Sequence, residues 1–351
     1  MYAFIAECQV ITPMFMAGAD GRTPELRPSE FKGMMRFWWR ATKAEDNIEK
    51  LKEEENKIFG GTGEKEGKSK IKLIIHRSDL SIGDCVQSEI PDSNGLKYLY
   101  YSTFSLKSSI RKYIKPGNVF KINISSFEKQ IFDQALASLW LAIYLGGFGT
   151  RARRGGGNIV VERVINIHPE SSKLSFTCNA NSRGDLKAWV SENINMIKNI
   201  VNQSNGTFKY STLKNGKILI FNPKNSWKDA LNFIGEKFKN FRTKYKTKIF
   251  ETAVFGMPVM YPRFRVRIVP YDNKRLSERW SSPLFMKVIK VENDNYYPIV
   301  TQLSPGGIDF VGKEIKKENS WNIEDKERFK ADLLNEFISW LETSNSEEIE
   351  L

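Results

Sequence analysis

The order of strand-forming and helix-forming segments in the first half of the chain constrains its fold more than any other feature. Four runs rich in β-branched and aromatic residues predict strands, and two amphipathic runs predict helices. In chain order these are a strand at residues 2–11, a helix from 29 to about 59, strands at 70–75 and 119–124, a helix from 126 to about 146, and a strand at 158–167. This order is typical of the split βαβ, or ferredoxin-like, fold.

The second half carries a weaker version of the same pattern. Helices are predicted at residues 186–201, 227–241 and 324–341, and strands at 218–221, 264–269, 284–291 and 296–301. We therefore expect an α+β protein with two ferredoxin-like (RRM-like) domains in tandem, with insertions. The boundary is predicted near residues 168–172, giving an N-terminal domain of residues 1–168 with a glycine-rich loop and a C-terminal domain of residues 169–351. The polar stretch 78–96 is predicted to be an insertion or a flexible loop.

The chain is basic, and its charge is unevenly distributed. Its 351 residues include 54 Lys and Arg against 41 Asp and Glu, a net charge of +13. Residues 183–290 carry 22 basic and 7 acidic residues, whereas residues 291–351 carry 6 basic and 14 acidic ones. A basic surface attracts polyanions, since each phosphate that it neutralises releases counterions. The alternative is a basic protein kept soluble by self-repulsion, with an acidic end that is solvated or docked on a basic neighbour.

Composition excludes several classes of protein. The three cysteines, Cys8, Cys85 and Cys178, are far apart and odd in number, which fits neither a disulfide framework nor a zinc site. Unpaired thiols fit a reducing compartment. The N-terminus lacks the features of a signal peptide, and no apolar run is long enough to span a bilayer. We expect a cytoplasmic protein with no membrane contact, no cofactor and no metal.

The segment 146–157, GGFGTRARRGGG, carries the most information. Glycine lets the backbone approach a ligand closely, and arginine forms paired hydrogen bonds with phosphates and stacks on bases. The segment follows a predicted helix and precedes a predicted strand, which is the reverse of a P-loop. The predicted RNA contacts in it are Gly149, Thr150, Arg151, Arg153, Arg154 and Gly155. The alternative is a flexible surface loop whose arginines face water.

A basic stripe follows the first predicted helix. Lys32, Arg36 and Arg40 recur every fourth residue, and like charges at this spacing destabilise a helix by roughly 0.2–0.5 kcal/mol per pair. Glu30 and Glu45 reach only the ends of the stripe. An unpaired stripe of this kind indicates a polyanion lying along the helix.

Three further residues near this helix are candidate RNA contacts. Trp39 lies on the basic side, where a base could stack on its indole. The alternative is that Trp39 packs against the preceding loop. That loop brings Arg22 and Arg27 close to the helix N-terminus, whose free amides favour anions.

The second half offers a possible second RNA surface. Arg263, Arg265 and Arg267 alternate with apolar residues, so a strand would place them on one face, and Arg279 follows. Of these, Arg265 and Arg279 are predicted RNA contacts. The alternative is a solvated sheet face.

Nothing in the sequence marks a catalytic centre. The only histidines are His76 and His168, and neither belongs to a metal-ligand pair or a nucleophile motif. The glycine-rich stretch 60–69 misses the Walker A spacing by one residue and precedes a strand, which excludes ATP binding. A metal-independent ribonuclease that uses one histidine or lysine with a tyrosine remains the alternative to a binding protein, although nothing in the sequence marks such a group.

Three motifs together resemble the RAMP superfamily of CRISPR-associated proteins. They are ITPMFMAGADGRTPELRPSEFKGMMRFWWRA, IFGGTGEKEGKSKIKL and GGFGTRARRGGGN, which occur in this order between residues 11 and 165. The pattern is most similar to the family of the first-numbered subunit of the Cmr complex, the type III-B effector. FGMPV at 255–259 and SSPLFMKV at 281–288 resemble that family more weakly.

The resemblance implies a fold and a function. It implies two ferredoxin-like domains and a non-catalytic, RNA-binding role in antiviral defence. The partners would be guide RNA, target RNA and other subunits of the Cmr effector complex, with this subunit toward the guide 3′ end. The family's glycine-rich loop corresponds to residues 146–157, and its basic first helix to Lys32, Arg36, Trp39 and Arg40. A metal-independent endoribonuclease of the guide-processing RAMP branch is the alternative, and the lack of a marked catalytic histidine argues against it.

Overall fold

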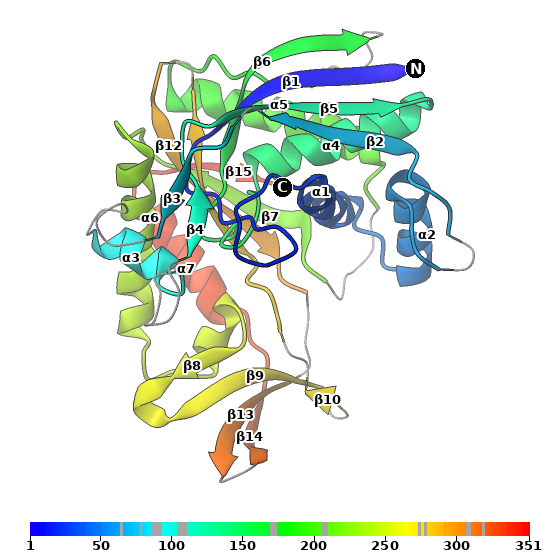
Figure 1. Ribbon diagram of the computed structural model, residues 1–351. Coiled ribbons are helices and arrows are strands. Elements are labelled where there is room, and N and C mark those ends of the chain that lie inside the picture. The colour runs from blue at the N-terminus through cyan, green and yellow to red at the C-terminus, as the bar shows by residue number, and fades with distance from the viewer. Residues whose placement is uncertain are drawn as a thin grey trace.

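The computed structural model describes the chain except residues 64–65, 78, 86–92, 104–110, 169–173, 205–209, 273–274, 277–278, 292, 307–309 and 318–319 (Figure 1). The elements follow one another in the order β1 (Tyr2–Val10), α1 (Pro28–Lys43), α2 (Ile48–Phe59), β2 (Ile71–Arg77), β3 (Ile82–Asp84), α3 (Asn94–Tyr100), β4 (Lys112–Ile114), β5 (Val119–Ser126), α4 (Lys129–Tyr144), β6 (Ile159–His168), α5 (Arg183–Val201), β7 (Thr212–Ile220), α6 (Trp227–Lys244), η1 (Glu251–Phe255), β8 (Val259–Tyr261), η2 (Pro262–Phe264), β9 (Val266–Asp272), β10 (Arg275–Leu276), β11 (Leu284–Lys290), β12 (Tyr296–Ser304), β13 (Phe310–Lys317), β14 (Ser320–Arg328), α7 (Asp332–Glu342) and β15 (Glu347–Glu350).

The first sheet has the topology that the sequence predicts. Its antiparallel strands lie in the order β2-β5-β1-β6. Alternate residues of β1, namely Phe4, Ala6 and Cys8, are buried because successive side chains of a strand point to opposite faces. Helix α4 packs on this buried face and α1 packs on α4. In Figure 1 α4 and α5 lie on one side of the sheet.

The second sheet repeats this arrangement. Its antiparallel strands lie in the order β11-β12-β7-β15, and the chain runs β7, α6, β11, β12, α7, β15. In both sheets the first strand is therefore central, flanked by the third and fourth. The predicted tandem ferredoxin-like α+β fold is confirmed.

Two insertions in the second unit build a further sheet. One insertion follows α6 and contains β8, β9 and β10, and the other follows β12 and contains β13 and β14. Together they form a sheet in the order β10-β9-β13-β14, with β8 also paired to β9. In the described residues a small apolar cluster at its core contains the buried side chains of Ala253, Met257, Ile268 and Val311, and Val266 and Val269 of β9 are also buried. Figure 1 shows this sheet at the bottom of the molecule, away from the first sheet.

Several predicted element boundaries were wrong. The helix predicted from 29 to 59 is two helices, because Ala44 adopts the left-handed conformation (φ 50°) and Asn47 caps α2 through Lys50 N. The stretch predicted as the loop 78–96 contains β3 and the start of α3, although residues 86–92 lie outside the described part. The helix predicted at 324–341 starts only at Asp332, because its first residues belong to β14. The β13–β14 hairpin was not predicted.

The two ferredoxin-like units pack closely together. Trp38 of α1 lies against Phe285 of β11, with ring centroids 4.9 Å apart. Helix α5 contacts both α4 and β15. Helix α5 follows the predicted domain boundary near residue 168 but contacts elements of both units, so the position of that boundary stays a prediction.

Three sequence expectations concern the cysteines, metal binding and membrane spans. Cys8, Cys85 and Cys178 are free and buried. In the described residues, no three or more His, Cys, Asp or Glu side chains gather into a group that could hold a metal ion. Among the helices of that same part, none combines the length and apolar character that a membrane span requires.

Candidate nucleic-acid interface

The glycine-rich segment is a packed turn rather than a loose loop. Gly149 has φ 79°, and a Cβ added there would lie 2.6 Å from the carbonyl oxygen of Phe15. The backbone N–H of Thr150 donates to the same carbonyl at 2.9 Å. Only glycine accepts this conformation and close approach at low cost. The glycines thus fix the segment against residues 13–16, which contradicts the alternative of a flexible surface loop.

Arg153 and Arg154 face the second unit, contrary to the expectation that they face RNA. Arg154 Nη2 donates to the carbonyl oxygen of Phe255 at 2.9 Å, and its guanidinium lies over the Phe238 ring at 4.9 Å. Arg153 donates to the carbonyl oxygen of Ser282. Burial lowers the pKa of Arg153 to about 10 and that of Arg154 to about 9, so both remain charged at neutral pH. Both side chains therefore hold the two units together.

Gly155 is also a packing residue. It has φ 82°, and an added Cβ would overlap the side chain of Leu231 in α6. Its carbonyl oxygen accepts a hydrogen bond from the buried Tyr100 hydroxyl at 2.9 Å. Asn158 continues the contact, since its Oδ1 accepts from the backbone N–H of Val288 at 2.9 Å. The contacts at this end of the segment therefore stabilise the fold.

The other end of the segment forms a surface with both positive charge and an aromatic ring. Arg151 is half-buried, and its guanidinium lies over the Tyr101 ring at 5.0 Å. Tyr101 is 69% exposed. Arg111 Nη2 donates to Thr150 Oγ1 at 2.9 Å. We call these four residues, Tyr101, Arg111, Thr150 and Arg151, the Arg151 ledge. It combines two cations with a ring on which a base can stack, which is the pairing that single-stranded nucleic acid requires.

Two residues of the Arg151 ledge, Tyr101 and Arg111, were not predicted from the sequence. Tyr101 and Arg111 lie 50 and 40 residues before Arg151, and the turn at 149–150 brings them together. The aromatic run YLYY at 98–101 was the available signal for Tyr101. Partial burial lowers the pKa of Arg151, since its guanidinium is partly desolvated.

Two of the three cations in the basic stripe of α1, Arg36 and Arg40, are paired, contrary to expectation. Glu55 of α2 accepts from Arg36 Nη1 at 2.8 Å and from Arg40 Nη1 at 2.6 Å. Arg36 Nη2 also donates to the carbonyl oxygen of Phe59 at 3.0 Å. Glu55 reaches both arginines because α2 folds back along α1, whereas a single helix from 29 to 59 would have carried it away from them. Lys32 is half-buried, and burial and then the Arg36 charge lower its pKa. Arg36 and Arg40 therefore fasten α2 to α1.

Trp39 packs inside the protein. Its side chain is 1% exposed, and its indole N–H donates to Gln134 Oε1 of α4 at 2.8 Å. A base cannot stack on a ring that the protein covers. The expected stacking position is therefore wrong, and the indole is hydrogen-bonded to α4.

The remaining predicted cations lie in two places. Arg22 is exposed on the loop before α1, and Arg27 occupies the N-cap position of α1, where Nη1 donates to the Ala17 carbonyl at 3.5 Å. In the second unit, Arg265 lies in a turn with φ 52° just before β9 and Arg279 is exposed.

The three arginines at 263–267 do not share a strand face. Arg263 belongs to η2, Arg265 to the following turn and Arg267 to β9. Arg267 Nε donates to the buried Glu314 carboxylate at 2.6 Å. The expected alternation fails because β9 begins only at Val266, and Arg267 serves mainly to neutralise Glu314.

Comparison with known proteins shows what the chain is similar to. The family model of the RAMP superfamily matches residues 7–160. The chain is 36% identical over 185 residues to CRISPR system Cmr subunit Cmr1-2 of Pyrococcus furiosus, and the match covers 47% of this chain and 97% of that protein. The chain belongs to the Cmr1 family. It is also 29% identical over 289 residues to Cmr1-1 of the same organism, covering 79% of this chain and 80% of that protein.

Solved structures show that the Cmr1-family fold extends over the whole chain. The crystal structure of Cmr1 from Pyrococcus furiosus has a TM-score of 0.67 at 21% identity, covering 99% of this chain and 98% of that one. A chain of the type III-B Cmr-beta complex bound to cognate target RNA and AMPPnP has a TM-score of 0.62 at 13% identity, covering 98% and 99%. All four residues of the Arg151 ledge lie within the RAMP match, whereas Arg265 and Arg279 lie beyond it.

Proposed function

We propose that this Cmr1-family chain is a cytoplasmic, non-catalytic, RNA-binding subunit of a type III-B CRISPR effector complex in antiviral defence. Its role would be to contact guide RNA, target RNA or both near the guide 3′ end, beside other Cmr subunits. The relatives are Cmr subunits by name, and the similar assembled structures contain target RNA. The observation that carries the proposal is the Arg151 ledge.

The chemistry of the ledge favours a single strand over a duplex. The Tyr101 ring is 69% exposed and offers a face for one unpaired base. Arg151 lies over that ring and Arg111 is hydrogen-bonded to the neighbouring Thr150, and the two supply the charge for the adjacent phosphates. In duplex RNA the bases are stacked on one another and cannot reach the ring. The ledge carries no base-edge code, so guide and target strands are bound by the same contacts.

The remaining predicted contacts extend the proposed RNA surface. We propose that Gly149 and Thr150 present backbone and hydroxyl groups to the strand, and that Arg22, Arg27 and Lys32 attract its phosphates from the loop and α1. Arg36 and Arg40 contribute less, because each shares its charge with Glu55. Arg265 and Arg279 stay proposed as contacts of the second unit.

The test is equilibrium binding of a labelled single-stranded RNA to the full chain at several salt concentrations. Arg151→Ala is expected to weaken binding about 3- to 10-fold for every sequence and to reduce the salt slope by about 1. Tyr101→Ala is expected to weaken single-strand binding without changing the salt slope, because the ring carries no charge. Lys72→Ala on β2 is the control, since it removes one exposed charge away from the ledge. If Arg151→Ala and Lys72→Ala have equal effects, the ledge is not the RNA site.

The enzyme alternative has a separate test. His76 is exposed on β2, and the side chain of His168 lies outside the described residues. The assay is incubation of labelled repeat RNA with the protein in EDTA. Specific cleavage that is lost in His76→Ala or His168→Ala would overturn the non-catalytic assignment and favour a guide-processing ribonuclease.

A further inference from the structure

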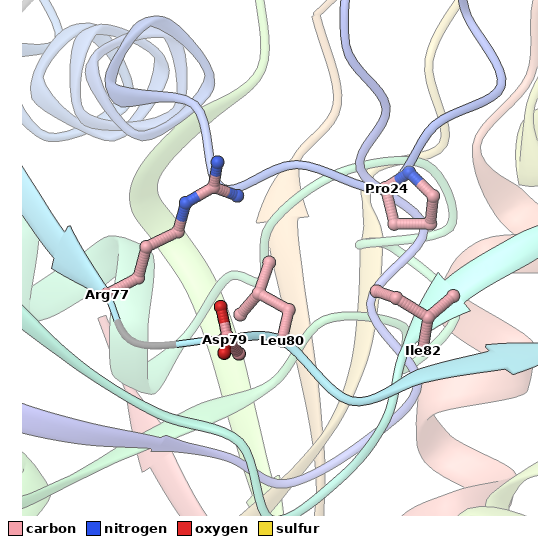
Figure 2. A pocket seen from close by; sticks show the side chains of 5 residues that line it. All are labelled: Pro24, Arg77, Asp79, Leu80 and Ile82. Carbon is pink, nitrogen blue, oxygen red and sulfur yellow. The ribbon is translucent and has the colours of Figure 1, made fainter.

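A surface pocket of about 570 Å³ lies beside the first sheet and takes no part in the Arg151 ledge. It is lined by Pro24, Arg77, Asp79, Leu80 and Ile82 (Figure 2). Figure 2 shows Arg77 reaching in from the end of β2, and Leu80 and Ile82 pointing toward the segment that carries Pro24. The volume falls within the range of roughly 300–1,000 Å³ that is typical of small-ligand pockets.

The pocket and the Arg151 ledge are joined by one short ribbon. Ile82 of β3 pairs with Ile114 of β4, and Arg111 of the ledge immediately precedes β4. A three-residue strand is about 10 Å long, so the pocket lies within a few nucleotides of the ledge along a single strand. On its other side, Pro24 is held by a bridge to Ala17 in the loop that also carries Arg22.

The lining combines apolar side chains with two opposite charges. Pro24, Leu80 and Ile82 are its apolar residues, and Arg77 and Asp79 are its charged residues, both of them exposed. Neither charged side chain forms an ion pair or hydrogen bond with another residue in the part of the chain that the structure describes. Both charges are therefore available to a ligand. The apolar residues suit a planar ring, Asp79 suits hydrogen-bond donors on one edge of that ring, and Arg77 suits an anion joined to it.

We infer that this pocket receives a guanine base of the RNA strand that crosses the Arg151 ledge. A carboxylate only accepts hydrogen bonds, and guanine is the base that presents two adjacent donors, N1–H and the N2 amino group, on its Watson–Crick edge. Asp79 accepts both, the three apolar side chains cover the base, and Arg77 binds the attached phosphate. The inference rests on the proposed RNA-binding function and adds a base preference to a surface that otherwise has none.

The experiment uses the full chain and two uridine-rich single-stranded RNAs that differ at one position. One carries a single guanosine, and the other carries inosine there, which lacks the N2 amino group. The wild-type chain is expected to bind the guanosine RNA about tenfold more tightly. Asp79→Asn is expected to abolish that preference, because the single amide oxygen of Asn can accept from N1–H, which both RNAs carry, and leaves no acceptor for the N2 amino group. Glu49→Gln, an equal change of charge at an exposed residue of α2, is the matched control and is expected to keep the preference.

The outcomes separate this inference from the proposed function. If the wild-type chain binds neither RNA, the proposed function fails and takes the pocket assignment with it. If it binds both equally and Asp79→Asn changes neither affinity, only the guanine pocket is overturned. If Asp79→Asn leaves the preference intact but weakens co-purification with another Cmr subunit, the pocket receives a protein side chain and the inference is also overturned.

Discussion

Arg154→Ala is expected to destabilise the fold, although the residue was first singled out as an RNA contact. The substitution removes the charged hydrogen bond to the Phe255 carbonyl at 2.9 Å and the guanidinium over Phe238 at 4.9 Å. A hydrogen bond from a charged group contributes roughly 1.5–3 kcal/mol, and a desolvated cation–π contact about 1 kcal/mol. We expect the free energy of unfolding to fall by about 2–4 kcal/mol.

The matched control lies three residues earlier in the same turn. Arg151→Ala removes a half-buried guanidinium over the exposed Tyr101 ring, a contact that contributes about 0.5–1 kcal/mol. The assay is urea unfolding followed by both tryptophan fluorescence and circular dichroism, because a chain with two packed units need not unfold in one step. Arg154→Ala should lower the denaturation midpoint of both signals, and Arg151→Ala should leave it nearly unchanged.

The opposite assignment predicts a different result. If Arg154 were an RNA contact, Arg154→Ala would keep the wild-type unfolding midpoint and would lose affinity for RNA as Arg151→Ala does. That result would refute the conclusion that Arg154 holds the two units together. A triple alanine variant of the three arginines cannot test RNA binding, because its loss of affinity would combine weakened binding with a loosened fold.

Three further expectations follow from single side chains. Lys287 is fully buried, and burial lowers its pKa to about 7, so on raising the pH the folded state loses this proton well before the unfolded state does. The free energy of unfolding should therefore rise between about pH 7 and pH 10, by up to roughly 1 kcal/mol per pH unit. Urea unfolding of Lys287→Met at several pH values should lack that rise. Gly155→Ala should cost about 2–3 kcal/mol, measured by urea unfolding, and Leu231→Ala should recover part of the loss if the overlap is the cause. Trp39→Phe should leave the RNA dissociation constant unchanged while lowering stability, because only the hydrogen bond to Gln134 and some packing are lost; a tenfold weaker RNA affinity would show that the ring reaches the strand.

Strand patterning made most of the fold predictable. Buried residues of β1 and β5 alternate with half-buried or exposed ones, and this two-residue period places a strand from sequence alone. The split of the first long helix was less visible, because the left-handed turn at Ala44 has no strong residue signature. Asn47, which caps α2, was the one usable signal.

The candidate site was predictable only in part, and the reason is the nature of the contacts. Arg153 and Arg154 bond to backbone carbonyl oxygens more than 100 residues away in sequence. Every residue carries such a carbonyl, so the residue types in the sequence do not indicate which carbonyl accepts the hydrogen bond. Glu55 could be assigned to Arg36 and Arg40 only once α2 was known to turn back. Sequence therefore showed which residues carry charge, and tertiary structure decided which charges face solvent.

The insertion sheet of the second unit has a consequence for how the molecule moves. In the described residues the apolar cluster at its core contains four buried side chains and is much smaller than the other two clusters of the molecule, so the hydrophobic free energy that holds it closed is a small fraction of the whole. Its strands pair with one another and not with either ferredoxin-like sheet. Such a unit can open and close while the two larger sheets stay intact, and its backbone amides should be the earliest of the strand amides to exchange with solvent deuterium.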